Sequence, residues 1–284
     1  MVRGTQGEVL SDDVTHRAGV LGSPVAHSLS PVLHTAAYRA LGLSDWRYSS
    51  ARVDASGFRA HVAALDDTWR GLSLTMPLKE VAFEVAARVS PVAAATGAVN
   101  TLVRDGDGWS ADNTDVAGMV RALAEAGVGT ASSAVVIGSG ATARSAVAAL
   151  ASLGATRVTF MVRGAARPAT LRQARSAGLD ASEVGLGAWP VDAGLVVSTV
   201  PVEASDPLAA GLPSQGLALL DVVYGGGPGA LSAAATHHGY AVVPGTAMLL
   251  HQAAEQVRLM TGLPAPVEAM RGALADARAG RGWS

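Results

Sequence analysis

The sequence of 284 residues contains no cysteine and has few aromatic and few charged residues. Without cysteine, disulfide bonds, thiolate chemistry and cysteine-ligated zinc sites are excluded, and we expect no metal. Aromatic residues make up 4% of the chain, no basic run exceeds two residues, and the net charge is −2. The chain therefore offers neither a stacking platform nor a basic surface, and we expect no nucleic-acid partner.

Long apolar runs are also missing. No uncharged stretch approaches the roughly 20 residues that a membrane-spanning helix needs, so we expect no membrane partner. Residues 1–16 carry three acidic residues and no apolar core, unlike a signal peptide. These features predict a cytoplasmic protein whose first dozen residues are disordered. Separately, we expect a monomer or a homodimer. The hydrophobic fraction of 49% and the chain length allow two globular domains.

Lysine is almost absent, because Lys79 is the only one and arginine holds the other twenty basic positions. A guanidinium stays charged at any accessible pH, whereas an ammonium in a partly buried site can give up a proton. A position that must donate a proton therefore tolerates lysine and rejects arginine. The alternative is a surface lysine that escaped a general drift toward arginine, and composition alone does not separate the two.

Short apolar runs alternate with helical patterns along the first part of the chain. We expect strands over 19–22, 46–53, 71–74 and 100–104, and helices over 31–41, 55–65 and 78–89. This alternation predicts parallel strand-helix-strand units. The pattern restarts near Ser133, with strands over 134–137, 157–162, 194–199 and 217–223, helices over 142–153 and to 177, and a loop over 225–229. A long helix over 246–260 and a final helix through 277 complete the chain.

The run from Val135 to Ala143 is a buried strand that enters a glycine-rich turn and a helix. It fits the dinucleotide fingerprint in its G-x-G-x-x-A form. Gly138 makes the tight turn, Gly140 lets the pyrophosphate approach the backbone, and Ala143 permits close helix packing. Because strand, turn and helix are all in place, a purely structural turn is the weaker interpretation.

The residues after the fingerprint indicate which dinucleotide it binds. Domains that bind NAD usually place an acid about 20 residues after the first glycine, to hold the ribose diol. No acid occurs between Gly138 and Leu179, and Arg163 and Arg167 follow the second strand instead. The pair suits a 2′-phosphate, so we predict NADP. The alternative, that arginine is simply common here, does not explain the missing acid.

Polar clusters also follow the strands of the first part. Ser28 and Ser30 precede a helix that they could cap, and Thr75 and Lys79 leave a strand and enter another helix. Residues 112–115, Asp-Asn-Thr-Asp, precede a third helix, whose dipole their carboxylates could complement. Three such clusters beside a nucleotide domain predict a single interdomain cleft more simply than three separate caps.

Taken in order, these motifs resemble those of the shikimate dehydrogenase family nearly from end to end. The sequence has G-x-P-x-x-H-S-x-S-P at 22–31, T-x-P-x-K at 75–79, A-V-N-T-L at 98–102, D-N-T-D at 112–115, D-V-V-Y at 221–224 and G-x-x-M-L-x-x-Q at 245–252. The resemblance implies NADP-linked interconversion of shikimate and 3-dehydroshikimate, the fourth step toward chorismate and the aromatic amino acids. Alternatives are a quinate/shikimate dehydrogenase that uses NAD, and a catalytically silent NADP-binding regulatory module.

Carried over to this sequence, the resemblance assigns Lys79 and Asp115 as the catalytic pair. Both also belong to the implied substrate site, with Ser28, Ser30, Thr75 and Tyr224 toward the carboxylate and Asn100, Asp115 and Gln252 toward the ring hydroxyls. The implied cofactor contacts are Gly138, Ser139, Gly140, Ala141, Thr142, Arg163, Arg167, Thr199, Val200, Gly245 and Met248. Gln252 also stands out by pattern, as a polar residue on or beside the apolar face of its helix that needs a partner.

The sequence departs from the family pattern in four places. The usual N-V-T is Ser73-Leu74-Thr75, the usual G-x-G-G ends in Ala141, the N-R-T after the second strand is Val162-Arg163-Gly164, and the loop after Tyr224 is glycine-rich. We therefore expect NADP as cofactor with some tolerance for NAD. The resulting fold prediction is a two-domain α/β protein, with a substrate domain over 1–114, a Rossmann-like NADP domain over 115–245, and C-terminal helices over 246–284 that return to the substrate domain.

Overall fold

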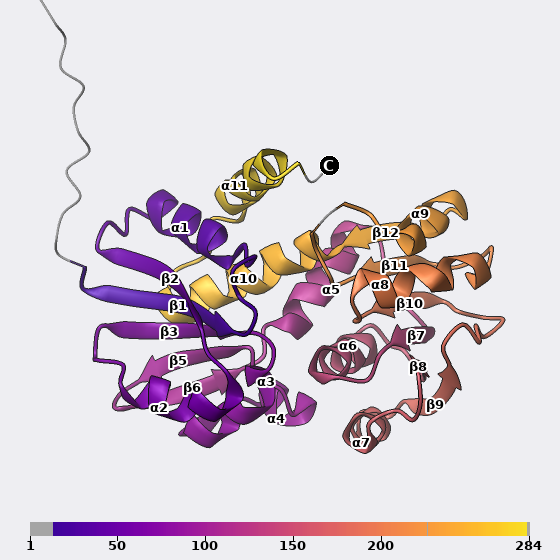
Figure 1. The fold of residues 1–284 in the computed structure, drawn as a ribbon, viewed down its shortest axis with the longest axis horizontal. Coiled ribbons are helices and arrows are strands. Elements are labelled where there is room, and N and C mark those ends of the chain that lie inside the picture. Colours follow the sequence, from indigo (N-terminus) through magenta and orange to yellow (C-terminus); the bar gives the residue numbers. More distant parts are fainter. Residues whose placement is uncertain (1–13, 226, 283–284) are drawn as a thin grey trace, which may run out of the picture.

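The computed structural model describes residues 14–225 and 227–282, and places two six-stranded sheets side by side (Figure 1). The first dozen residues, for which we predicted disorder, lie outside the described residues. Strands β1 to β6 form the first sheet and β7 to β12 the second. Two long helices, α5 (Asp115–Glu125) and α10 (Gly245–Thr261), run between the sheets. The predicted two-domain α/β architecture is thus confirmed.

The first sheet has the strand order β2-β1-β3-β5-β6-β4. Its strands are β1 (His16–Gly22), β2 (Trp46–Arg52), β3 (Trp69–Leu74), β4 (Arg88–Val89), β5 (Thr101–Asp105) and β6 (Gly108–Asp112). The pairs β1/β2 and β1/β3 are parallel, as predicted, but β5 is antiparallel to both β3 and β6. The prediction of purely parallel units was therefore wrong in this half. The antiparallel β5/β6 pair arises from a two-residue hairpin at Gly106 and Asp107, where Gly106 adopts φ +59°.

The predicted helix over 78–89 was also wrong in its second half. Helix α3 (Leu78–Val81) gives way to a 3₁₀ turn (Ala82–Val85), and the chain then forms β4, which pairs with β6. Helix α4 (Pro91–Thr96), which we had not predicted, follows at once. Ser90 caps it by accepting a hydrogen bond from Ala93 N, and Gly97 ends it in the left-handed conformation. Sheet pairing here overrides the local helical pattern.

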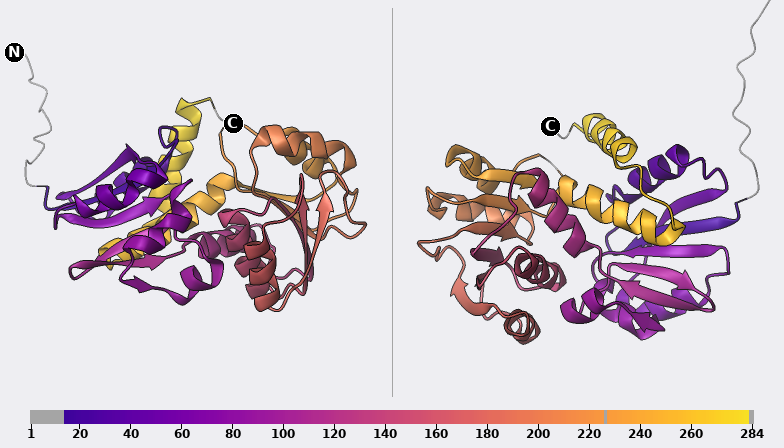
Figure 2. Two further views of the ribbon diagram at one scale, coloured as in Figure 1. Left: turned by 60° about the horizontal axis from the view of Figure 1, so that its bottom comes forward. Right: turned by 180° about the vertical axis from the view of Figure 1, so that it is seen from behind.

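Helices cover both faces of the first sheet. On one face, α2 (Phe58–Ala63), α3 and α4 pack against strand side chains such as Leu21, Leu72 and Leu102. A short 3₁₀ turn (Ala55–Gly57) precedes α2. On the other side, α1 (Ser30–Ala40), α10 and α11 (Val267–Gly280) share a separate core (Figure 2). This side of the first sheet is thus covered partly by α10 and α11, which follow the second sheet in the sequence.

The second sheet is parallel throughout, as predicted, in the order β12-β11-β10-β7-β8-β9. Its strands are β7 (Ser133–Ile137), β8 (Arg157–Val162), β9 (Asp180–Gly185), β10 (Leu195–Ser198), β11 (Ala218–Asp221) and β12 (Ala241–Pro244). The edge strands β9 and β12 had not been predicted. The central strands are buried on both faces, so they are apolar without alternation and were easier to find.

Side chains of the central strand alternate between two helical layers. Val136 contributes to a core with α5, α6 (Ala141–Ser152) and α7 (Pro168–Ser176), whereas Val135 and Ile137 contribute to a core with α9 (Ala230–His237) and the 3₁₀ turn over Asp206–Gly211. Helix α8 (Val202–Ser205) leads into that turn. Within residues 14–225 and 227–282, none of these helices has both the length and the apolar character to span a membrane.

Candidate active site

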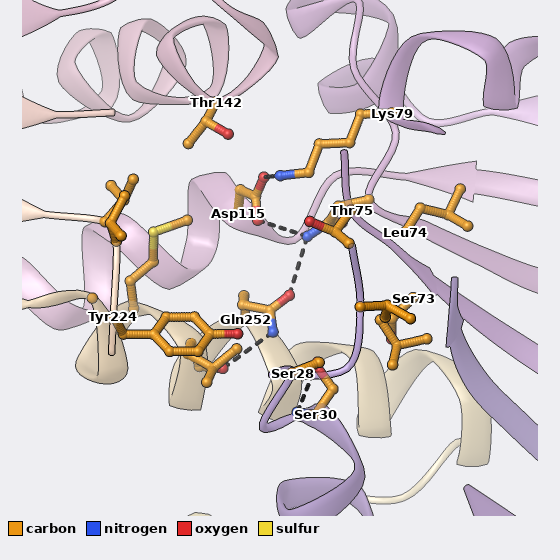
Figure 3. A pocket seen from close by; sticks show the side chains of 18 of the residues that line it. Ser28, Ser30, Ser73, Leu74, Thr75, Lys79, Asp115, Thr142, Tyr224 and Gln252 are labelled. Atoms are coloured by element: carbon orange, nitrogen blue, oxygen red, sulfur yellow. Dashed lines mark hydrogen bonds and ion pairs between the residues drawn. The ribbon is translucent and has the colours of Figure 1, made fainter. Parts of the chain in front are cut away.

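A cleft of about 410 Å³ lies where the ends of several strands meet α10. The segments after β1, β3 and β11 line it, together with the first turns of α5, α6 and α10. Figure 3 shows Lys79 and Asp115 at one end of this pocket, and Ser28 and Ser30 at the other. The eight residues of the implied substrate site all line the cleft: Ser28, Ser30, Thr75, Lys79, Asn100, Asp115, Tyr224 and Gln252. What each of them does remains a prediction.

Lys79 and Asp115 form a largely buried ion pair. Lys79 lies on the short helix α3, Asp115 is the first residue of α5, and 2.6 Å separates Lys79 Nζ from Asp115 Oδ2. Their side chains are 14% and 5% exposed, so the lysine is the one more accessible from the cleft. The backbone carbonyl of Lys79 accepts a hydrogen bond from Val99 N, which ties α3 to the strand region. This lysine is thus no isolated surface residue.

Asn100 joins this pair to α10. Its Nδ2 donates to Asp115 Oδ1 (2.8 Å) and to Gln252 Oε1 (3.2 Å), while its Oδ1 accepts from Thr114 N and from the Thr101 hydroxyl. The donors on one side and acceptors on the other fix the orientation of the amide. Gln252 is buried and donates to Leu249 O, which confirms the expectation that it needs partners.

The opposite end of the cleft carries hydroxyl groups. Ser28 Oγ accepts a hydrogen bond from Ser30 N at 3.2 Å, while the N-cap position of α1 is Leu29, which supplies no side-chain cap. Tyr224 reaches the same end, and desolvation of its phenol raises the pKa above the usual value. Close packing places Thr75, because a Cβ on Gly22 would lie 2.3 Å from Thr75 Cγ2. The glycine of the first motif is therefore required by the strand-to-strand contact beneath the site.

A second cavity, of about 390 Å³, runs along the fingerprint. Gly138, with φ +102°, forms its turn, and a Cβ there would lie 2.6 Å from Thr199 Oγ1, so only glycine fits. A Cβ on Gly140 would meet nothing within 4 Å, which leaves the backbone open to a ligand. Ala143 is fully buried beneath the turn. These features fit the pyrophosphate of a dinucleotide.

The predicted cofactor residues fall into three groups. Gly138, Ser139, Gly140, Arg163, Arg167 and Val200 line the fingerprint cavity. Thr142, Gly245 and Met248 line the cleft instead, where the two cavities approach each other. Ala141 begins α6, and Thr199 donates to Ile137 O beneath the Gly138 turn. Arg163 and Arg167 are exposed beside the glycine loop and can pair with the extra 2′-phosphate that distinguishes NADP from NAD. The residues present therefore fit NADP.

Sequence reasoning missed the structural roles of three residues that hold the site together. The buried Arg144 on α6 donates to Thr96 O, Gly97 O and Glu80, and so connects the fingerprint helix to the first sheet. Ser73 and Gln256 line the cleft behind Asn100. For Gln256 a signal existed, since it lies one helical turn after Gln252 on the same face. For the others, only the fold reveals the contact.

Known proteins share both the sequence and the fold. A model described as the shikimate dehydrogenase substrate binding domain matches residues 20–102, and one described as the shikimate 5′-dehydrogenase C-terminal domain matches residues 245–275. The chain is 40% identical to a shikimate dehydrogenase (NADP(+)) of Halobacterium salinarum, over 90% of this chain and 97% of that one. It is 34% identical to that of Methanothermobacter thermautotrophicus, over 92% and 96% of the two chains.

Solved structures agree with these sequence matches. The shikimate dehydrogenase of Mycobacterium tuberculosis superposes with a TM-score of 0.84 at 43% identity, covering 92% of this chain and 99% of that one. A shikimate 5-dehydrogenase of Thermus thermophilus, solved in complex with NADP(H) and shikimate, gives a TM-score of 0.81 at 32% identity, covering 92% and 99%. Matches of this extent, together with the motifs in the cleft, show that the chain belongs to the shikimate dehydrogenase family.

Proposed function

We propose that this protein is an NADP-dependent oxidoreductase that interconverts shikimate and 3-dehydroshikimate, in the cytoplasm, on the route to chorismate and the aromatic amino acids. The observation that carries the proposal is the buried Lys79–Asp115 pair at one end of a cleft whose other end holds hydroxyl groups. Family membership supports the same reaction. A polar ligand with a carboxylate at one end and ring hydroxyls at the other suits this arrangement.

We assign the substrate domain to residues 1–114 and 246–284, and the NADP domain to residues 115–245. All strands of the first sheet precede α5, and all strands of the second lie between α5 and α10. Helices α10 and α11 pack with α1 on the first sheet, in keeping with this division. The cleft then lies between the domains, so that the two reactants can bind from opposite sides.

The substrate contacts follow from the two ends of the cleft. Ser28, Ser30, Thr75 and Tyr224 are proposed to hold the carboxylate through their hydroxyl groups. Asn100, Asp115 and Gln252 are proposed to hold the ring hydroxyls. The amide of Asn100 is already oriented by its neighbours, and its Nδ2 donates to Asp115 and Gln252, the two other residues of this group. Such preorganisation places the reacting hydroxyl next to Lys79.

Lys79 and Asp115 are proposed to move the proton. In the reductive direction, the Lys79 ammonium donates a proton to the developing alkoxide oxygen, and in the oxidative direction the amine takes it back. Asp115 accepts the Lys79 hydrogen bond and so holds the nitrogen toward the cleft. A positioned proton donor of this kind typically contributes about 10²–10⁴-fold to the rate. Gly138 and Gly140 would hold the dinucleotide, which would supply the hydride as NADPH in the reductive direction and accept it as NADP+ in the oxidative direction.

Arg163 and Arg167 are proposed to hold the 2′-phosphate of the cofactor. Both line the fingerprint cavity, and the chain between Gly138 and Leu179 has no acid that would hold a ribose diol. Arg167 also lies 3.7 Å from Glu80 on the substrate side of the cleft. The substitution of the family's N-R-T by Val162-Arg163-Gly164 supports some use of NAD.

The test is turnover by the purified protein and by Lys79→Ala. We expect wild-type protein to form NADPH with shikimate and NADP, and quinate or NAD in parallel reactions to give slower turnover. Lys79→Ala should remain folded with a lower thermal midpoint, because Asp115 loses its counter-charge, and should keep the NADPH affinity but lose at least about 10²-fold in kcat. Lys79→Arg is the matched control for charge, and it should be similarly inactive because a guanidinium does not exchange its proton.

Near-normal activity of Lys79→Ala would contradict the role of the pair. Equal rates with quinate or with NAD would move the protein to the broader quinate/shikimate class. Intact NADPH binding without turnover of shikimate would instead favour a silent binding module.

A further inference from the structure

A chain of hydrogen bonds runs behind the substrate cleft and ends at Asn100. The Tyr48 phenol donates to Ser73 Oγ (2.6 Å), and the Ser73 hydroxyl donates to Gln256 Oε1 (2.8 Å). Gln256 Nε2 then donates to Thr101 Oγ1 (3.0 Å) and to Asn100 O (3.2 Å). Ser73 and Gln256 are 4% and 1% exposed and both line the cleft. The members come from β2, β3, β5 and α10, so only the folded chain assembles them.

In the structure the hydrogens of this chain run in one direction. The single phenolic hydrogen of Tyr48 goes to Ser73, so the Ser73 hydrogen is free for Gln256 Oε1, and the Gln256 amide must then turn its Nε2 toward Thr101. The Thr101 hydrogen in turn goes to Asn100 Oδ1 at 2.8 Å. Desolvation of its hydroxyl raises the pKa of Tyr48 above the usual range, so this group remains a donor at all working pH values.

His34 reinforces the same direction. Its Nε2 lies 3.3 Å from Gln256 Oε1, and burial keeps the ring neutral by lowering its pKa to about 3. Among the described residues, His34 Nδ1 has no hydrogen-bond partner, so the one ring hydrogen is best used at Nε2. Two donors therefore converge on Gln256 Oε1, and a flipped amide would face both of them with its own hydrogens.

The consequence for the site is the orientation of Asn100. Its Oδ1 faces Thr101 and Thr114 N, which leaves its Nδ2 facing Asp115 and Gln252. We propose that Gln256 is a positioning residue for substrate binding, which with Tyr48 and Ser73 fixes the Asn100 amide so that its Nδ2 faces Asp115 and Gln252, the two residues proposed with it to hold the ring hydroxyls. The proposal rests on the proposed function, and it names residues beyond the eight of the implied substrate site. Ser73, which replaces the Asn of the usual N-V-T, then transmits the hydrogen bond from Tyr48 to Gln256.

The first test is Gln256→Met, which keeps the length of the side chain and removes both polar ends. We expect KM for shikimate to rise about tenfold, with kcat reduced less than threefold and KM for NADP unchanged, because proton and hydride transfer stay intact once the substrate is bound. Direct titration calorimetry with shikimate should show the same tenfold loss. Gln215→Met, at an exposed position in the loop before β11 and away from the cleft, is the matched control and should leave every constant unchanged.

A second variant keeps the test decisive if Gln256→Met does not fold. Tyr48→Phe removes the hydroxyl group at the start of the hydrogen-bond chain and leaves the ring in place. It should raise KM for shikimate about threefold. An unchanged KM in Tyr48→Phe and in any folded Gln256 variant, with wild-type protein active on shikimate, would overturn the positioning role alone. If wild-type protein itself does not turn over shikimate, the proposed function fails first, which separates the two outcomes.

Discussion

Gly118 on α5 sets how closely α5 approaches α10, and its replacement by alanine probes the site from behind. A Cβ at this position would lie 2.9 Å from both Gln252 Cβ and Met248 O, and 3.0 Å from Gln252 N. Ordinary van der Waals contact begins near 3.4 Å, so the new methyl group is about 0.5 Å too close to atoms that cannot rotate away. We expect the two helices to separate by a similar distance in Gly118→Ala.

The cost of this separation can be estimated. Overpacking typically costs about 1–3 kcal/mol, and alanine returns up to about 1 kcal/mol in helix propensity, so a net loss of about 1 kcal/mol is expected. The thermal midpoint should fall by roughly 2–4 °C. Gln252 would move away from Asn100, to which its hydrogen bond is already 3.2 Å long. Since a 1 Å misplacement can cost 10²-fold, we expect KM for shikimate to rise about tenfold.

The matched control is Gly272→Ala. Gly272 also lies within a helix, α11, but a Cβ there would meet nothing within 4 Å. This variant should be as stable as the wild type or more stable by up to about 1 kcal/mol, with unchanged kinetics. Differential scanning fluorimetry and initial rates measure both effects. If Gly118→Ala were as stable and as active as Gly272→Ala, the argument from helix contact would be refuted.

Two further predictions concern the cofactor and pH. Arg163→Ala should weaken NADPH binding about tenfold or more while leaving NADH binding unchanged, as measured by quenching of protein fluorescence; equal losses for both cofactors would contradict a contact with the 2′-phosphate. Burial lowers the pKa of His34 from 6.5 to about 3. Between these values the unfolded chain binds a proton that the folded chain does not, so stability should fall with decreasing pH by up to about 1.4 kcal/mol per unit. His34→Gln lacks this group and should show a shallower fall of the thermal midpoint from pH 6.5 downward; an identical slope would exclude His34 as its source.

Local signals in the sequence were sufficient for the four central strands of the second sheet and for the fingerprint turn, but not for the edge strands β9 and β12. The strand, turn and helix around Gly138 appear as predicted, because a doubly buried strand is apolar throughout and Gly138 needs a positive φ. The predictions of a long helix over 246–260 and of a Gln252 that needs partners on it were also correct. The prediction that the polar clusters line one cleft held for Ser28 and Ser30, for Thr75 and Lys79, and for Asp115 of the third cluster. Their chemical roles remain predictions.

Contacts between distant segments explain what the sequence did not reveal. Strand β4 has only two residues and exists because it pairs with β6, so the helical pattern around it was misleading. The Asp105-Gly106-Asp107-Gly108 turn was a hairpin signal that we did not use. Tyr48 and Gln256 meet through Ser73 only once β2, β3 and α10 are in place. Propensity and spacing carry no information about such contacts.

The return of α10 and α11 to the first sheet has a consequence for synthesis on the ribosome. The apolar face of α1 that includes Leu33 and Ala37 packs against α10 and α11, which are made after the second sheet. The second sheet is complete at Pro244, so it can fold while the first sheet still awaits its cover. A nascent chain that has emerged from the ribosome as far as residue 244 would therefore have a complete second sheet, while the apolar face of α1 is still exposed. The cleft is therefore complete only after α10 and α11 have packed on the first sheet.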